Sequence, residues 1–361
     1  MSGHRILCIN LGSTSSQAAV FDDGVPIAEI EASHSAEDLK AHAGIAAQTA
    51  LRKALIEKLL AEKSIDLHSI EAIAARGIGT QGRYQAGAYR VSREMAHDAL
   101  SARHVGLGVG TQIAYAWQEE YGIPAYLYDV VQTDEITDVA RISGTPLIAR
   151  SGATHTLNTK AVARKVAAEL GKAYETVTFI MCHLGGGIST SLHQNGRIVD
   201  VTSVDEGTFT PDRSGRVPCV KLLQMALSGK YTPESLKAML SGNAGLIGYL
   251  GTNDCREIER RIAQADQQAE LIYRAMAYQT AKDIGALSAA ACGCVDAIVL
   301  TGGIAYSKLF TGWLHEMVSY LAPVIVRPGS MEMEALYQGV CRVLDGAEQA
   351  KEYKLGETVF Q

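Results

Sequence analysis

Two short segments of the sequence carry residue types that suit anion binding, and they share one pattern. The first is an apolar run that ends at Asn10 and is followed by hydroxyl residues over Ser13–Ser16. The second is an apolar run that ends at His183 and is followed by three glycines, Gly185–Gly187. A second run and a turn follow each segment. The pattern predicts two β-hairpins whose tips present N–H groups and hydroxyls to an anion.

A third segment, Gly302-Gly303, follows the apolar run Val295–Leu300. Glycine allows a close approach to phosphate, and ligand pockets form at the carboxyl ends of strands in α/β sheets. The three segments in this order predict two related half-domains that hold one phosphate-bearing ligand between them.

Charged residues at the ends of expected elements extend this chemistry. Arg76 ends a buried strand and Arg213 lies in a turn-like loop, where arginine suits bidentate capture of carboxylate or phosphoryl oxygens. Asp129 at a strand end and Glu332 at a helix start are candidate acids for magnesium or its water shell. Three histidines precede or lie in loops, namely His104, His155 and His183.

Two common nucleotide motifs do not apply. The glycines over Gly106–Gly110 do not follow a strand and lack an acid at the right distance, so they do not predict a dinucleotide site. The Gly-x4-Gly-Lys-Ser/Thr phosphate loop is absent from the sequence, which excludes the ordinary P-loop class.

Composition limits the other possibilities. The chain has 361 residues and a net charge of −6 with no long basic run, which argues against a nucleic-acid surface. No apolar stretch reaches the roughly 18 residues that a membrane span needs, and no signal peptide is visible. The seven cysteines are scattered without a CxxC pair, which predicts reduced thiols and no structural zinc. We therefore expect a cytoplasmic protein.

Strand-like and helix-like segments alternate, which predicts an α/β fold. The expected strands cover residues 6–10, 17–21, 27–32, 71–75, 125–131, 176–182, 189–193, 197–202, 295–300 and 323–326. The expected helices cover 34–63, 92–100, 111–121, 156–170, a region from about 252 to 291 with at most one break, and 331–344. We expect a first domain over 1–150 and a second over 151–330, with 331–361 packing back on the first.

Together these segments resemble the butyrate kinase family, a branch of the acetate kinase (acetokinase) group in the actin-like and sugar-kinase superfamily. The resemblance covers almost the whole chain. The matching segments are 10–15 (NLGSTS), 140–144 (ARISG), 157–164 (LNTKAVAR), 183–189 (HLGGGIS), 213–215 (RSG), 249–254 (YLGTND), 275–279 (AMAYQ) and 300–307 (LTGGIAYS).

The resemblance implies two duplicated actin-like, ribonuclease H-like domains with an active-site cleft between them. It implies reversible phosphoryl transfer between ATP and butyrate or a related short or branched carboxylate, with Mg²⁺, giving an acyl phosphate and ADP. It also implies a homo-oligomer, a dimer or higher, while composition predicts no nucleic-acid or membrane partner.

Site roles follow from the resemblance, residue by residue. Catalytic roles are implied for Arg76, Arg213, His183, Asp129 and His155, and His104 is implied in substrate binding. The resemblance implies that the phosphates of the nucleotide are bound by Asn10, Gly12, Ser13, Ser15, Gly185, Gly186, Gly187, Gly302 and Gly303. Asp129 and Glu332 are implied on the metal side, where Glu334 is close enough in register to compete with Glu332.

The chain departs from the family pattern at several positions. Leu11 stands where proline is frequent, and Gln17 stands where related kinases commonly carry lysine. The segment 76–84 differs from the usual glycine-rich form, and residues 105–107 replace a familiar Ala-Ser-Asn. The last two changes concern the expected acceptor pocket, so the preferred acyl chain stays open.

Two other functions remain as alternatives. A nucleotide-binding regulator with little turnover would fit the loss of lysine at Gln17. A kinase acting on a sugar or another alcohol would need an aspartate base, for which Asp129 or Asp205 would serve.

Overall fold

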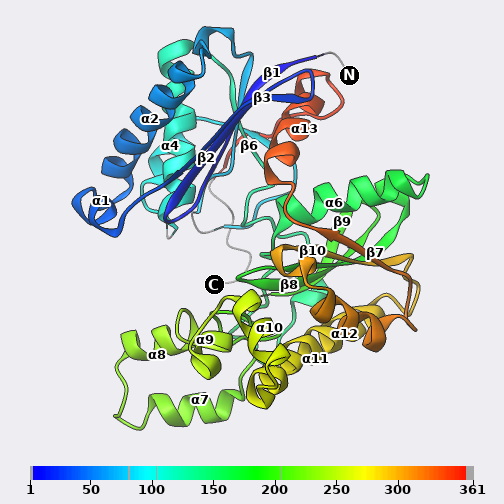
Figure 1. Cartoon of the computed structure of the whole chain (residues 1–361). Helices are drawn as coiled ribbons and strands as arrows, with labels where there is room; N and C mark the ends of the chain where they lie inside the picture. Colours follow the sequence, from blue (N-terminus) through cyan, green and yellow to red (C-terminus); the bar gives the residue numbers. More distant parts are fainter. Residues whose placement is uncertain (1–2, 80–81, 103, 204, 355–361) are drawn as a thin grey trace. The chain divides into compact units, whose positions relative to one another are not determined.

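The computed structural model describes residues 3–79, 82–102, 104–203 and 205–354 (Figure 1). Contacts divide the chain into two compact units: unit 1 comprises Met1–Asp134 with Met331–Gln361, and unit 2 comprises Glu135–Ser330. Compact units do not define folding domains, so the expected boundary near residue 150 stays a prediction.

Unit 1 contains a six-stranded sheet in the order β3-β2-β1-β4-β6-β5. Its strands are β1 (Arg5–Leu11), β2 (Ser15–Asp22), β3 (Val25–Ser33), β4 (Ala72–Ala75), β5 (Ala88–Arg90) and β6 (Ala125–Tyr128). Its helices are α1 (Ala36–Ala41), α2 (Ile45–Glu62), α3 (Arg93–Ala99), α4 (Val105–Tyr121) and α13 (Glu332–Leu344), with a 3₁₀ turn at Leu67–Ser69.

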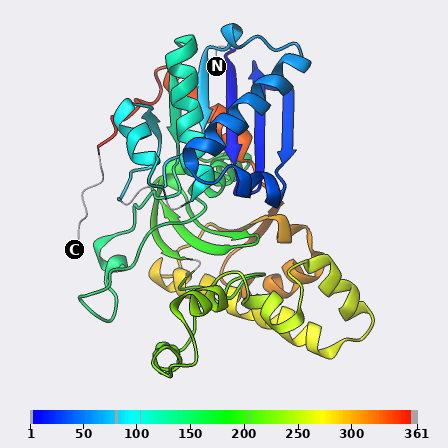
Figure 2. The same ribbon diagram turned by 90° about the vertical axis from the view of Figure 1, so that its left-hand side faces the viewer.

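Strands β1, β2 and β3 form an antiparallel meander, and β1, β4 and β6 run parallel. Helices α2 and α4 cover one face of this sheet and α13 covers the other (Figure 1). Figure 2 shows β1 to β3 as neighbouring arrows with α2 lying across them. The buried run over β1 follows from this cover on both faces, because a strand buried on both sides needs continuous apolar residues.

Unit 2 contains a five-stranded sheet in the order β11-β10-β7-β8-β9. Its strands are β7 (Thr178–Leu184), β8 (Ile188–Gln194), β9 (Arg197–Thr202), β10 (Ala297–Gly302) and β11 (Val324–Pro328). Its helices are α5 (Asp138–Arg141), α6 (Thr156–Glu169), α7 (Cys219–Ala226), α8 (Pro233–Leu240), α9 (Gly245–Leu250), α10 (Cys255–Ala263), α11 (Gln267–Ala290) and α12 (Lys308–Val318), with 3₁₀ turns at Tyr174–Thr176 and Gly303–Tyr306.

The two sheets repeat one plan. In unit 2 the meander β7-β8-β9 is antiparallel, and β7, β10 and β11 run parallel. The hairpin registers correspond as well, since Asn10 pairs with Gln17 across β1 and β2, and His183 pairs with Ser189 across β7 and β8. The expected duplication and α/β class are therefore confirmed.

Several helix bounds differ from the sequence expectation. The predicted helix over 34–63 is two helices, because the chain turns at Gly44 with φ of +90°. The single break allowed within 252–291 separates α10 from α11, and the Asp254 side chain, which accepts the Arg256 N–H, caps α10.

The glycines over Gly106–Gly110 lie inside α4, which begins six residues before the expected start. A Cβ at Gly106 would clash with the carbonyl oxygen of Leu11, and one at Gly110 would clash with that of Arg76. These glycines therefore bring the helix against the backbone of the first hairpin and of β4. Their function is close packing, which agrees with the exclusion of a dinucleotide site.

The sequence analysis missed short elements. Strand β5 has only three residues, too few for an alternation to be read. Helices α7 and α8 have eight residues each, and although their sequences are amphipathic, neither contains a buried residue. No helix among the described residues is long and apolar enough to cross a membrane.

Replacing Gly110 by alanine is expected to destabilise the protein. The added methyl meets backbone at the Arg76 carbonyl, and overpacking of this kind costs about 1–3 kcal/mol. Gly285→Ala is the matched control, because Gly285 lies in α11 with no atom within 4 Å of an added Cβ. Thermal unfolding should show a lower Tm for Gly110→Ala and an unchanged or higher Tm for Gly285→Ala. Equal Tm values would contradict the close-packing role of Gly110.

Candidate active site

Unit 1 brings three of the expected site residues into one polar cluster. Asn10 is the penultimate residue of β1, Arg76 follows β4, and Glu332 begins α13. The Asn10 amide donates to Glu332 Oε2 at 2.7 Å, and Arg76 NH1 lies 3.3 Å from both Asn10 Oδ1 and Glu332 Oε2. The Arg76 and Glu332 side chains are 25% and 18% exposed, so the pair is partly desolvated but open to a ligand. An arginine held in this way can receive phosphoryl or carboxylate oxygens.

The structure distinguishes the two acids at the start of α13. Glu332 contacts Asn10 and Arg76, whereas Glu334 is exposed and its side chain makes no hydrogen bond among the described residues. This favours Glu332 as the acid of the cluster. Its role toward a metal stays a prediction.

Asp129 occupies a constrained position directly after β6. It is 2% exposed and has φ of +42°, a conformation that is uncommon outside glycine. Its Oδ1 accepts the Gly87 N–H at 2.7 Å, and its own N–H donates to the Gly87 carbonyl at 3.2 Å. Strain of this kind persists where the surroundings fix it and is frequent at functional sites.

His104 is the N-cap residue of α4 and is exposed. The first turn of α4 packs on the carbonyls of Leu11 and Gly12 through Gly106. His104 is therefore placed beside the tip of the first hairpin, where a role in substrate binding stays a prediction.

Gln17 lies on the same sheet face as Asn10, because the two are cross-strand partners. Its amide donates to Glu31 Oε1 at 3.3 Å. A lysine at position 17 of this chain would lie beside the Glu31 carboxylate. That carboxylate would neutralise part of the lysine's positive charge.

Unit 2 brings His155 and His183 together. Their rings stack with centroids 4.0 Å apart and planes at 10°. His155 Nδ1 lies 2.8 Å from Ser189 Oγ, and His183 Nδ1 lies 2.9 Å from Asn158 Nδ2. His183 is the penultimate residue of β7, and His155 and Asn158 belong to the start of α6.

The hydrogen bonds around Asn158 indicate the tautomer of His183. The Thr301 hydroxyl donates to the Gly329 carbonyl at 3.1 Å, so it accepts from Asn158 Nδ2, which lies 3.4 Å away. The Asn158 group that faces His183 is then the NH₂ group, and His183 Nδ1 is an acceptor. The proton of neutral His183 is therefore on Nε2, where it can be donated to an oxyanion. The sequence analysis did not single out Asn158 as a site residue; its only signal was its place in a matching segment.

The glycines of unit 2 shape a cavity of about 850 Å³. Gly185, Gly186 and Gly303 line it, together with Pro211, Asp212, Asn253, Asp254, Cys255, Arg256, Glu259, Ile304, Tyr306 and Ser307. Its size suits a nucleotide-sized ligand. Burial raises the pKa of the Cys255 thiol to about 11, so this thiol stays protonated at neutral pH and adds no charge to the cavity lining.

Two expected glycines support this cavity without lining it. Gly302 has φ of +91°, and a Cβ there would clash with the carbonyl of Leu184. Gly302 and Gly329 also exchange two backbone hydrogen bonds, at 2.9 and 3.0 Å. The Gly187 carbonyl accepts the Gly185 N–H at 3.1 Å, which closes the tip of the second hairpin.

Arg213 lies on a loop that is fixed at its base. The Thr210 hydroxyl accepts the Arg213 N–H at 3.1 Å, and the Arg213 carbonyl accepts the Thr210 N–H at 2.9 Å. The Arg213 side chain is 38% exposed, and the only carboxylate paired with it among the described residues is that of Asp212, at 3.9 Å. Its guanidinium is therefore accessible to an anion.

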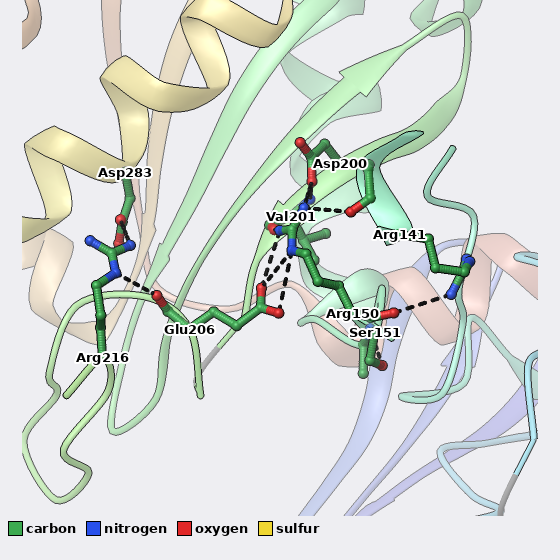
Figure 3. A network of polar contacts seen from close by, with 10 residues as sticks. Arg141, Arg150, Ser151, Asp200, Val201, Glu206, Arg216 and Asp283 are labelled. Carbon is green, nitrogen blue, oxygen red and sulfur yellow. Dashed lines mark hydrogen bonds and ion pairs between the residues drawn. The ribbon is translucent and has the colours of Figure 1, made fainter. Parts of the chain in front are cut away.

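A polar network anchors the base of this loop (Figure 3). Asp283 of α11 accepts the Thr208 N–H at 2.9 Å and an Arg216 N–H at 2.6 Å, and Arg216 also donates to the Glu206 carbonyl. The Glu206 carboxylate pairs with Arg150, which also contacts Asp200. Burial raises the pKa of Asp283, whereas its pairing with Arg216 opposes that shift.

Expected metal-side acids are compatible with Mg²⁺. No group of three or more His, Cys, Asp or Glu side chains in the described ranges could hold a metal alone. A nucleotide-bound Mg²⁺ keeps phosphate and water ligands and needs only one or two protein carboxylates. Glu332 and Asp129 supply that donor type.

The family model described as "Acetokinase family" matches residues 124–309. The chain is 40% identical over 355 residues to "Butyrate kinase 2" of Clostridium acetobutylicum, covering 97% of this chain and 99% of the relative. It is 42% identical over 353 residues to "Probable butyrate kinase" of Enterococcus faecalis, covering 96% and 97%. The chain belongs to the acetokinase family.

Solved structures confirm the fold. The acetate kinase of Porphyromonas gingivalis superposes with a TM-score of 0.78 at 18% identity, covering 94% of this chain and all of that one. A propionate kinase from Francisella tularensis gives a TM-score of 0.74 at 19% identity, covering 93% and 98%. The expected actin-like fold is therefore confirmed, and kinases of this family use ATP and Mg²⁺ in general.

Removing the Asn158 amide should impair catalysis through His183. Asn158→Leu keeps the approximate volume but leaves His183 Nδ1 free to hold the proton, so Nε2 can lose its donor role. We expect kcat to fall by about tenfold to a hundredfold, by analogy with the loss seen when the hydrogen-bond partner of a metal-ligating histidine is removed.

Thr280→Val is the control, since Thr280 is a buried hydroxyl of α11 bonded to the Met276 carbonyl. Steady-state rates and melting curves of both variants would be compared. An Asn158→Leu enzyme with the kcat of the Thr280→Val control would contradict this assignment.

Gln17→Lys should leave activity similar or raise it, because the new ammonium adds a positive charge beside Asn10 and has Glu31 as a partner. Gln17→Met separates the effect of charge from that of chain length. Rates at varied ATP concentration are the measurement. A collapse of activity in Gln17→Lys alone would show that this position works differently from the family pattern.

Proposed function

We propose that this protein is a butyrate kinase that transfers a phosphoryl group reversibly between ATP and butyrate, or a related short or branched carboxylate, with Mg²⁺. The observation that carries the proposal is the 40–42% identity, over nearly the whole chain, to two relatives named butyrate kinase. The polar clusters around Arg76 and His183 supply residue types that this chemistry needs.

In the forward direction a carboxylate oxygen attacks the γ-phosphorus of ATP. The bond from that phosphorus to the bridging oxygen breaks, and ADP leaves with the electron pair. The acceptor is already ionised at neutral pH, so no general base is required. The protein's contribution is alignment and the neutralisation of negative charge.

Each residue has a proposed part in that neutralisation. Arg76 and Arg213 bind phosphoryl oxygens, and His183 Nε2–H donates to the same group. Asn10 and the hydroxyls of Ser13 and Ser15 position phosphate at the first hairpin tip. Mg²⁺, when bound with the nucleotide, supplies further charge neutralisation, and Glu332 and Asp129 hold it or its waters.

The remaining assignments concern the ligand surroundings. His155 stacks on His183 and holds its ring, while His104 contacts the acceptor. Gly12 and the glycines of unit 2 allow the backbone to approach phosphates, and the 850 Å³ cavity receives the nucleoside. We also propose a homo-oligomer in the cytoplasm.

Acyl hydroxamate formation with Mg-ATP tests the reaction across acetate, propionate, butyrate, isobutyrate and valerate. We expect the highest rate with a four- or five-carbon acid. A folded protein that binds ATP but gives no hydroxamate with any acid would overturn the proposal and favour a nucleotide-binding regulator.

Arg213→Ala is expected to lower kcat by about 10³-fold or more, the loss seen when an arginine that stabilises phosphoryl transfer is removed. Stability should be nearly unchanged, because the side chain is partly exposed and its paired carboxylate is 3.9 Å away. Arg260→Ala, at an exposed position of α10, is the control. Near-normal turnover by Arg213→Ala would remove Arg213 from the mechanism.

A further inference from the structure

Arg52 is a buried arginine that no sequence motif singled out. It lies in α2 on the stripe of buried residues that includes Gln48, Ile56 and Leu60, and none of its side chain is exposed. An arginine in such a stripe needs hydrogen-bond partners, since burying an unpaired charge is costly.

The partners of Arg52 are backbone carbonyls of the first hairpin tip. Its NH1 donates to Gly12 O at 2.7 Å and to Ser15 O at 3.0 Å. Its NH2 donates to Ser13 O at 2.8 Å and to the Gln48 side chain at 2.7 Å. One guanidinium therefore holds three carbonyls of a four-residue loop.

The fourth carbonyl of the loop is also occupied. Thr14 O accepts the N–H of His34 at 2.8 Å, and the Gly12 N–H donates to Ser15 O at 3.0 Å. All four carbonyls from Gly12 to Ser15 are thus hydrogen-bonded within unit 1, so the loop conformation is fixed from its inner side.

This arrangement sets the direction of the loop's N–H groups. In a trans peptide the C=O and the following N–H point in opposite directions. With the Gly12 and Ser13 carbonyls aimed at Arg52, the N–H groups of Ser13 and Thr14 point away from it. Both residues are exposed, and neither N–H donates a hydrogen bond within the described part of the chain. Successive free N–H groups of this kind form an anion-binding concavity.

The charge of Arg52 has no acidic counterpart. Within the described ranges its guanidinium bonds only carbonyls and an amide, and no carboxylate pairs with it. The nearby His34 adds no second positive charge, since burial, and then the Arg52 charge itself, lowers the pKa of its imidazole. The positive charge is therefore available to an anion at the loop.

We propose that Arg52 is a positioning residue for phosphate binding: it fixes the Gly12–Ser15 loop with its N–H groups outward, and its unneutralised charge attracts the phosphate bound there. This inference rests on the proposed function for the loop's ligand. It adds a residue that never touches the ligand but determines how the loop receives it. It also supplies, from beneath the loop, positive charge at a hairpin that carries Gln17 where lysine is common.

Two substitutions separate the charge from the geometry. Arg52→Gln removes the charge and most of the carbonyl contacts, whereas Arg52→Lys keeps the charge but cannot donate in the same planar fork. Two matched controls lie on the same helix. Ile56→Val loosens buried packing of α2, and Lys53→Gln removes a charge that pairs instead with Glu57 and Glu120.

The measurement is calorimetric binding of Mg-ATP and of adenosine to each full-length variant, with melting curves and steady-state KM and kcat. We expect Arg52→Gln to weaken ATP binding at least tenfold with adenosine binding unchanged, and Arg52→Lys to fall between it and the wild type. Ile56→Val and Lys53→Gln should bind both ligands normally.

The proposal is overturned if Arg52→Gln binds ATP as the wild type does, or if it weakens ATP and adenosine equally. If Arg52→Gln does not fold, Arg52→Lys is decisive, and wild-type ATP affinity in that variant would overturn the proposal. Failure of the proposed function is a separate result, because it appears as no hydroxamate from the wild type. The comparison of ATP and adenosine affinities can still be interpreted if the wild type forms no hydroxamate.

Discussion

The structure depends on how the backbone polar groups of two hairpin tips are satisfied. A loop that presents N–H groups to a ligand must place its carbonyls elsewhere, because a buried carbonyl without a partner costs free energy comparable to a lost hydrogen bond. In unit 1 the Arg52 guanidinium donates hydrogen bonds to the carbonyls of Gly12, Ser13 and Ser15. The helix spacing of α2, the close approach of α4 and the register of β1 with β2 all serve to keep this tip in one conformation.

The two units meet the same requirement by different means. Unit 1 uses a buried cation behind a loop rich in hydroxyls. Unit 2 uses a glycine tip that closes on itself, with the Gly187 carbonyl accepting the Gly185 N–H, and it packs Gly302 where a Cβ would clash with the Leu184 carbonyl. The penultimate residue of the first strand in each hairpin is also held differently: Asn10 contacts the charged pair Arg76–Glu332, whereas His183 contacts the neutral pair Asn158–Thr301. A neutral partner leaves the histidine proton on Nε2 without adding a second charge.

The sequence predicted the parts whose signal is local. Both hairpins, the strand expected over 295–300 and the α/β class follow from runs of apolar residues and from turns, and they are confirmed, with β10 observed at Ala297–Gly302. The start of α4 was misplaced because glycine has low helix propensity, which close packing on Leu11 and Arg76 overrides. Arg52 and Asn158 could not be recognised, since nothing in their own neighbourhood shows which distant carbonyl or imidazole they reach. The roles of the expected site residues remain predictions. The structure does bring Asn10, Arg76 and Glu332 into contact, and it stacks His155 on His183.

The asymmetry between the tips bears on how each would respond to a ligand. A loop held by one guanidinium is stiff in shape but carries a charge that is only neutralised when an anion arrives, so part of its binding energy is electrostatic. A loop shaped by glycines carries no such charge, and its selectivity must come from fit and from the donors around it. Phosphoryl transfer places the largest change of charge on the migrating group. Under the proposed function, the first hairpin, with Arg76 beside it and Arg52 beneath it, has the charge to follow that change, while the second hairpin contributes the His183 Nε2–H donor and lies beside a cavity of nucleotide size.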